Sequence, residues 1–387
     1  MSDANRRSIA LFLLLSIAFM SAVFAVQGAL LNAMIDAYAL DASNQGSANA
    51  AAFAGGIVAL LTAFFLQGRV RKRALLRASI GLCAAGLVML WLAPGYLVFC
   101  AVWFVVGYAL AMMDTVLSAC MADLYTGEAA TRMLCVLHTF FGLASVLTPI
   151  GFQALLAGGM PWKRIYLVIA VSGALLLLAG TLVRIARRIP DPEVLNARAV
   201  SLGDIAGGIR AGHLALLVIA MLFHGVFLSG LNTWINRYAD ALSGSLALPA
   251  QSCLFLGIML SRLLMPLLPI KTGRYVQFGG LLGAVALGIG LCLTSGIALR
   301  VALVLAGLLA GALIPCVLSL GCDRLRENTL LVTTAMMLAL YAGQAVSSPI
   351  IARLEAAFGL RWGIALCAVC MALCSVFCMM DQAKEQA

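Results

Sequence analysis

Long and nearly unbroken apolar segments run from about residue 9 to residue 380 of this chain. Each is about 20 residues or longer, the length that a helix needs to cross the hydrocarbon core of a bilayer. A membrane-spanning β-barrel would instead alternate apolar and polar residues. The pattern therefore predicts an all-α membrane protein with twelve transmembrane helices, at 9–39, 50–68, 74–93, 96–122, 132–157, 163–186, 213–239, 247–268, 274–294, 298–321, 329–353 and 360–380.

The longest polar stretch between the apolar segments is 187–212, and it separates six predicted helices from six others. Connections within each group are short, which makes successive helices antiparallel neighbours in a compact bundle. We therefore expect an N-terminal six-helix bundle at 1–186, a cytoplasmic linker at 187–212 and a C-terminal six-helix bundle at 213–387.

The two halves of the chain repeat each other at a constant offset of 200 residues. Residues 31–39 and 231–239 are identical at five positions, and Asp36 of the first segment is replaced by its amide, Asn236, in the second. A duplicated unit repeated in the same order across a very apolar chain is typical of a transporter whose solute binds between two pseudo-symmetric halves. The same offset relates Asp123 to Asp323, Pro149 to Pro349 and Trp162 to Trp362.

Composition and charge agree with a multi-pass membrane protein. Hydrophobic residues make up 64% of the chain and charged residues 10%, and the mean hydropathy is +1.07. With a cytoplasmic N-terminus, 19 of the 25 Lys and Arg residues fall in predicted cytoplasmic segments, so both termini are expected in the cytoplasm and the protein in the cell inner membrane. The net charge of +10 reflects this topology, and no nucleic-acid partner is expected, because the basic residues are scattered over short loops.

Several local motifs resemble those of a known family. Asp114 within Met113–Thr115, Pro315 followed by Ser319–Gly321, and Tyr341–Gln344 are similar to motifs of the proton-coupled fucose, galactose and glucose symporters. The segment Leu137–Gly142 resembles a motif that is common in sugar-type facilitators. With the six-plus-six arrangement, they resemble the major facilitator superfamily over nearly the whole chain. The resemblance implies a fold of two pseudo-symmetric six-helix bundles and transport of a sugar together with a proton.

Two positions depart from that family pattern. Gly68–Arg73 resembles the basic end of the signature loop of the superfamily and lacks its acidic residue. The acidic residue of helix 1 in the fucose-type symporters aligns with Asn32 of this chain and not with Asp36.

Two carboxylates are candidates for proton coupling. Asp114 lies inside the fourth predicted helix, where a charged carboxylate is costly unless it is protonated, paired or solvated. It either binds the transported proton or forms a structural hydrogen bond to a neighbouring helix. Asp36 lies near the outer end of the first helix, where it either titrates or is an ordinary solvated acid.

Candidate substrate ligands are amide, aromatic and imidazole side chains. In the seventh helix Gly225, Ser229, Asn232, Asn236 and Asp240 follow spacings of four, three, four and four, so they form a polar stripe along one face. Such groups both donate and accept hydrogen bonds, as the hydroxyls of a sugar require, but they equally suit hydrogen bonds between helices. The predicted substrate-binding residues are Gln27, Asn32, His138, Asn232, Trp234, Asn236, Tyr341 and Gln344.

Charged residues at predicted cytoplasmic helix ends are candidates for a gate. Salt bridges among them would close the cytoplasmic side when the transporter opens outward, and Arg262 is expected either to pair with a helix end or to extend toward the interface. The predicted gating residues are Asp123, Arg132, Arg262, Asp323 and Arg324.

The expected function is secondary active transport of a small polar solute, a sugar first of all, by proton symport with alternating access. A proton-driven exporter of an amphipathic or drug-like compound is the alternative, and a non-transporting sensor or scaffold is a second class. Glycine-rich phosphate loops, zinc-ligand triads and nucleophile elbows are absent from the sequence, so we expect no enzyme activity, cofactor or metal. The expected partners are the solute, protons and the bilayer, and we expect a monomer.

Overall fold

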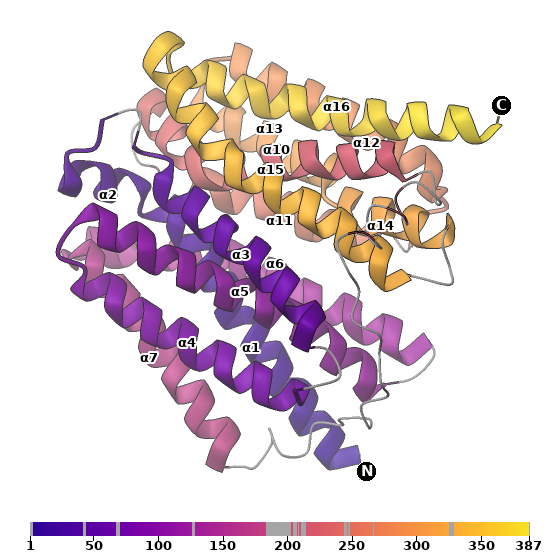
Figure 1. The fold of residues 1–387 in the computed structure, drawn as a ribbon. Coiled ribbons are helices and arrows are strands. Elements are labelled where there is room, and N and C mark those ends of the chain that lie inside the picture. The colour runs from indigo at the N-terminus through magenta and orange to yellow at the C-terminus, as the bar shows by residue number, and fades with distance from the viewer. Residues whose placement is uncertain are drawn as a thin grey trace. The chain divides into compact units, whose positions relative to one another are not determined.

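The computed structural model describes residues 3–41, 44–66, 70–125, 128–182, 203, 207, 209, 214–243, 246, 248–265, 267–324 and 329–386. Most of these residues lie in helices, which Figure 1 shows as coiled ribbons. The helices of the first half are α1 (Asp3–Ala29), α2 (Leu31–Tyr38), α3 (Ser47–Leu66), α4 (Lys72–Leu92), α5 (Tyr96–Leu124), α6 (Glu128–Ala157) and α7 (Trp162–Leu182). Those of the second half are α10 (Ala215–Ser243), α11 (Ala250–Leu264), α12 (Thr272–Cys292), α13 (Gly296–Ala310), α14 (Leu313–Arg324), α15 (Thr329–Phe358) and α16 (Leu360–Gln386).

The helices confirm the membrane class that the apolar segments predict. Within the described residues, ten helical segments are long and apolar enough to cross a membrane, and two shorter apolar helices lie at Ser47–Ala63 and Ala250–Leu264. These segments correspond in order to the twelve predicted ones. In lipid, a helix satisfies its backbone hydrogen bonds internally, which is why such uniform apolar sequences fold this way.

Two predicted helices are each divided in the structure. The first is interrupted at Leu30, which separates α1 from the short α2. The tenth is interrupted at Gly311 and Ala312, between α13 and α14. Pro315 follows the second break by one turn, and a proline leaves the carbonyl four residues earlier without its helical donor. Hydrophobicity alone does not reveal either interruption, because the flanking residues are apolar on both sides.

By its internal contacts the chain divides into two compact units. Unit 1 consists of residues 1–26 and 51–199, and unit 2 consists of residues 27–50 and 200–387. The end of α1, all of α2 and the start of α3 therefore belong with the C-terminal helices. The expected linker at 187–212 lies almost entirely outside the described residues.

In unit 1, α4 packs against α5 and α7. An aromatic cluster joins α5 and α7: Phe99, Trp103, Trp162 and Tyr166 meet edge to face with ring centroids 5.9–6.4 Å apart. Trp103 is only 1% exposed, so its indole is part of this core. Edge-to-face contacts between such rings stabilise their packing beyond the area that they bury.

In unit 2, α10 packs against α15 and α16, while α12 packs against α13 and α16. Buried serines bond across these contacts. Ser347 donates to the Val226 carbonyl at 2.7 Å, and Ser375 donates to the Val276 carbonyl at 2.7 Å while accepting from the Gly280 amide at 2.9 Å. Small hydroxyl side chains let membrane helices approach closely and add hydrogen bonds between them.

Candidate functional site

A group of hydrogen-bonded polar side chains lies inside unit 2, where the segments around α2 and the start of α3 meet α10, α11 and α15. We call this group the polar cluster. It consists of Asn32, Asn49, Ser229, Asn232, Trp234, Asn236, Arg237, Asp240, Gln251, Ser348 and Glu355.

The predicted stripe on α10 supplies the centre of the cluster. Asn232 is fully buried and accepts a hydrogen bond from Gln251 Nε2 at 2.7 Å. Asn236, one turn further, donates to Gln251 Oε1 at 3.1 Å and accepts from the Gln251 backbone amide at 2.9 Å. In this structure the two asparagines therefore join α10 to α11, which is the arrangement expected of interhelical hydrogen bonding.

These bonds give a physical reason for the replacement of Asp36 by Asn236 in the repeat. The Gln251 amide lies in the first turn of α11, where backbone N–H groups have no helical acceptor, and an oxygen at position 236 satisfies it. Gln251 Oε1 also needs a donor, which an amide provides and an ionised carboxylate does not. Asp36 is exposed on α2 and meets no such requirement.

Asn49 connects α3 to the same cluster. Its amide group donates to Ser229 Oγ at 2.9 Å and to Ser348 Oγ at 2.8 Å. The Trp234 indole N–H also donates to Ser348 Oγ, at 3.1 Å, and Trp234 is fully buried. The other end of the Asn49 side chain, Oδ1, is buried and receives no hydrogen bond from any described residue.

Charged side chains form the edge of the cluster. Arg237 on α10 pairs with Glu355 on α15, with both Nε and Nη2 at 3.0 Å from Oε1. Its Nη1 donates to Asn32 Oδ1 at 3.2 Å, and Asn32 Nδ2 donates to Asp240 Oδ2 at 3.4 Å. The Arg237 side chain is 26% exposed and that of Glu355 17%, so the pair is partly shielded from solvent.

Glycines permit the close backbone contacts around the cluster. A Cβ atom at Gly28, in the last turn of α1, would overlap the backbone carbonyl of Asn232. A Cβ atom at Gly46, just before α3, would overlap the backbone of Ser348. Any larger residue at either position therefore separates these segments from α10 or α15.

Arg262 provides a hydrogen-bond donor to a free backbone carbonyl at the break between α13 and α14. Because Pro315 has no N–H, the Gly311 carbonyl lacks its helical donor, and Arg262 Nε donates to it at 3.2 Å. Tyr275 Oη accepts from the Ala312 amide at 3.0 Å on the other side of the break. The expectation that Arg262 pairs with a helix end thus has a specific structural counterpart.

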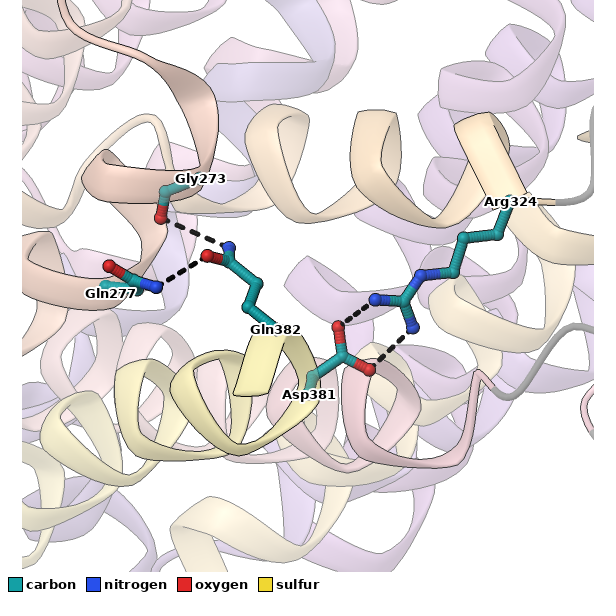
Figure 2. A network of polar contacts seen from close by, with 5 residues as sticks. All are labelled: Gly273, Gln277, Arg324, Asp381 and Gln382. Atoms are coloured by element: carbon teal, nitrogen blue, oxygen red, sulfur yellow. Dashed lines mark hydrogen bonds and ion pairs between the residues drawn. The ribbon is translucent and has the colours of Figure 1, made fainter. Parts of the chain in front are cut away.

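Arg324 takes part in an ion pair with the last helix. Its Nη1 and Nη2 lie 2.6 Å and 2.5 Å from the two carboxylate oxygens of Asp381 on α16 (Figure 2). The next residue, Gln382, accepts from Gln277 Nε2 at 2.5 Å and donates to the Gly273 carbonyl at 3.2 Å, so α16 is tied to α12 as well as to α14. Asp323, one residue before Arg324, is exposed.

The remaining predicted residues are divided between the two units. Asp114 on α5 and His138 on α6 are partly buried and belong to unit 1, and Tyr341 on α15 is partly buried in unit 2. The side chains of Asp123 and Arg132 lie outside the described part of the structure.

Comparison with known families decides the class of the protein. The sequence profile of the Major Facilitator Superfamily matches residues 12–332. This chain belongs to the Major Facilitator Superfamily. It is therefore a secondary transporter and not an enzyme, as the sequence predicts. No curated protein sequence matches the chain.

Solved structures of superfamily members share the fold at low identity. A bacterial homologue of the human lysosomal transporter Spinster, inward-facing and occupied, matches with a TM-score of 0.79, 14% identity and coverage of 99% of this chain and 98% of that one. A POT family transporter in complex with 5-aminolevulinic acid matches with a TM-score of 0.77 and 13% identity, over 98% of this chain and 96% of that one. The E. coli fucose:proton symporter FucP matches with a TM-score of 0.67 and 17% identity, over 95% of this chain and 97% of that one. These identities establish the fold, and the subgroup of the superfamily stays a prediction.

Sequence reasoning missed several partners in this superfamily member. Gln251, Asn49 and Glu355 are isolated polar residues in apolar or mixed segments, and their partners are 15 to 299 positions away. Asp381 likewise meets Arg324 across 57 positions. The sequence does show that these amides and acids lie in or beside membrane spans, where polar groups need partners. It does not show which residue each partner is.

Proposed function

We propose that this superfamily transporter carries a small polar solute, a sugar first of all, by symport with protons. Residues 1–186 and 213–387 would act as the two halves of an alternating-access cycle, with both termini in the cytoplasm and the chain in the cell inner membrane. The solute enters on the side where α1 ends and leaves on the side where α1 begins.

The observation that carries the solute class is unused hydrogen-bonding capacity in buried amides of unit 2. Within the part of the chain that the structure describes, Gln27 Nε2 is a buried donor without an acceptor, and Asn49 Oδ1 and Gln344 Oε1 are buried acceptors without donors. Leaving such groups unpaired is costly, so a ligand or water that fills them is stabilised. A polyhydroxy solute both donates and accepts, as this mixture of amide ends requires.

Asp114 is the proposed proton-binding residue. It is a partly buried carboxylate within the span formed by α5, and its repeat counterpart in the C-terminal half is the apolar Ile314. Ionisable residues inside membrane spans are retained for function by default, since their burial is costly. The exposed Asp36 is the weaker candidate, because full solvation supplies no coupling to a conformational change.

The proposed cytoplasmic gate uses the charged helix ends of both halves. Asp123 and Arg132 are assigned to it from the N-terminal half, and Asp323, Arg324 and Arg262 from the C-terminal half. The bonds of Arg324 and Arg262 within unit 2 support a role for these two in holding the C-terminal gate helices in place.

Uptake into proteoliposomes tests the proposal. The purified protein is reconstituted, and accumulation of a panel of radiolabelled hexoses and pentoses is followed with and without an inwardly directed proton gradient. We expect at least one sugar to accumulate above equilibrium with the gradient and to equilibrate without it. Gradient-driven extrusion of an amphipathic dye, with no uptake of any sugar, would contradict the proposed solute class and direction.

A further inference from the structure

One asparagine, Asn32, links two opposite charges of a helix from the other half of the repeat. Asn32 lies on α2, and its side chain meets Arg237 and Asp240, which are three residues apart on α10 and therefore share a helix face. The amide orientation follows from chemistry, because a guanidinium only donates and an ionised carboxylate only accepts.

Glu355 holds the same arginine from α15. Arg237 divides its donors between Glu355 Oε1, at 3.0 Å from both Nε and Nη2, and Asn32 Oδ1, at 3.2 Å from Nη1. The bond from Asn32 Nδ2 to Asp240 Oδ2 is long, at 3.4 Å, and therefore weak. The Arg237–Glu355 ion pair thus fixes Arg237 within the C-terminal half, and Asn32 is the residue whose hydrogen bonds to α10 break most easily.

We propose that Asn32 is the releasable link of the outer gate, which opens when its two hydrogen bonds to Arg237 and Asp240 break. This inference rests on the proposed topology, in which α2 lies at the outer face. Release costs little, because Arg237 and Asp240 then lie one turn apart on the same helix with opposite charges and pair with each other. Neither charge is left without a partner.

The role requires an amide at position 32. An aspartate would bind Arg237 but repel Asp240, and an apolar residue would bind neither. Asn32, which the sequence analysis counts among the candidate solute ligands, is in this proposal a positioning residue that sets the stability of the closed outer gate.

A swap of the two side chains provides the decisive test. N32D alone places two carboxylates together and weakens the gate. D240N alone keeps an acceptor for the Asn32 amide and changes little. In the double variant N32D/D240N, the new carboxylate accepts from Arg237 and from the new amide, so both bonds form again with the net charge of the wild type.

Hydrogen exchange of backbone amides, measured by mass spectrometry in lipid nanodiscs without any solute, reports how readily α2 separates from α10. We expect N32D to raise exchange in α2 and the first turns of α3 by about tenfold, and N32D/D240N to return it to the wild-type rate. The control is N44A, which removes an exposed asparagine side chain of the same segment that donates to Asp41 Oδ1 at 2.8 Å. Its exchange in α2 should match the wild type.

Two results would overturn the proposal. One is exchange in N32D equal to that in N44A, and the other is a double variant whose exchange exceeds that of N32D. Since the measurement contains no sugar and no proton gradient, it is independent of the uptake assay. Failure of sugar uptake with a rescued double variant would refute the solute class and leave the gate in place.

Discussion

The ion pair between Arg324 and Asp381 makes a quantitative prediction for Asp381→Asn. The asparagine has almost the same shape but carries no charge, and its NH₂ group faces a guanidinium that can only donate. Side-chain exposures of 14% for Arg324 and 2% for Asp381 place the pair among largely buried ones, for which losing one partner costs about 3–5 kcal/mol. Because Arg324 retains some solvent, we expect about 3 kcal/mol, the lower end of that range.

Local hydrogen exchange measures this cost where it arises. A loss of about 3 kcal/mol accelerates exchange of amides near the ends of α14 and α16 by roughly a hundredfold, if these ends open together. Asp323→Asn is the matched control, because Asp323 is an exposed carboxylate next to Arg324, and exposed ion pairs contribute about 0–1 kcal/mol. Equal exchange in the two variants would show that the buried pair does not hold α16 to α14.

Three further predictions concern single substitutions. Gly46→Leu should reduce transport at least about tenfold by keeping α3 away from α15, whereas Gly95→Ala, whose Cβ would meet no atom within 4 Å, should transport normally in the same vesicle assay. Tyr275→Phe should lower the thermal unfolding temperature, because losing the hydroxyl that accepts from the break between α13 and α14 costs about 1–3 kcal/mol; an unchanged temperature would refute that role. Asn236→Asp should also destabilise the fold by about 1–3 kcal/mol, because it removes the donor to Gln251 Oε1, whereas Asp36→Asn should cost less than about 0.5 kcal/mol. Equal unfolding temperatures in the two variants would contradict the reason given for an amide at position 236 and a carboxylate at position 36.

The sequence predicts the fold class well because that class depends on segment length and hydrophobicity. The twelve apolar segments correspond to helices; some ends agree closely, as in Tyr96–Leu124 for 96–122, and others differ more, as in Leu360–Gln386 for 360–380. The interruptions at Leu30 and at Gly311 are not predicted. The second depends on the missing N–H of Pro315 together with Arg262 from another helix, which is tertiary information.

The candidate site is predicted as residue types and less well as partners. The spacing along α10 places Ser229, Asn232 and Asn236 on one face, because helical periodicity determines it, and all three take part in hydrogen bonds to other segments. Which groups meet that face depends on the packing of α3, α11 and α15, and no local pattern marks Asn49 or Gln251 as the partners. Solute specificity depends on a few side chains, which form no periodic pattern in the sequence.

Proton movement driven by the solute is the direct test of proton symport through Asp114. Proteoliposomes with an internal pH indicator and no imposed gradient receive an inward gradient of a sugar that the transporter accumulates. We expect the wild type to acidify the lumen as the sugar enters, and Asp114→Asn to exchange the sugar without moving protons. Lumenal acidification at the wild-type rate in Asp114→Asn would contradict the proton-binding role of Asp114, and sugar entry without acidification in the wild type would contradict proton symport.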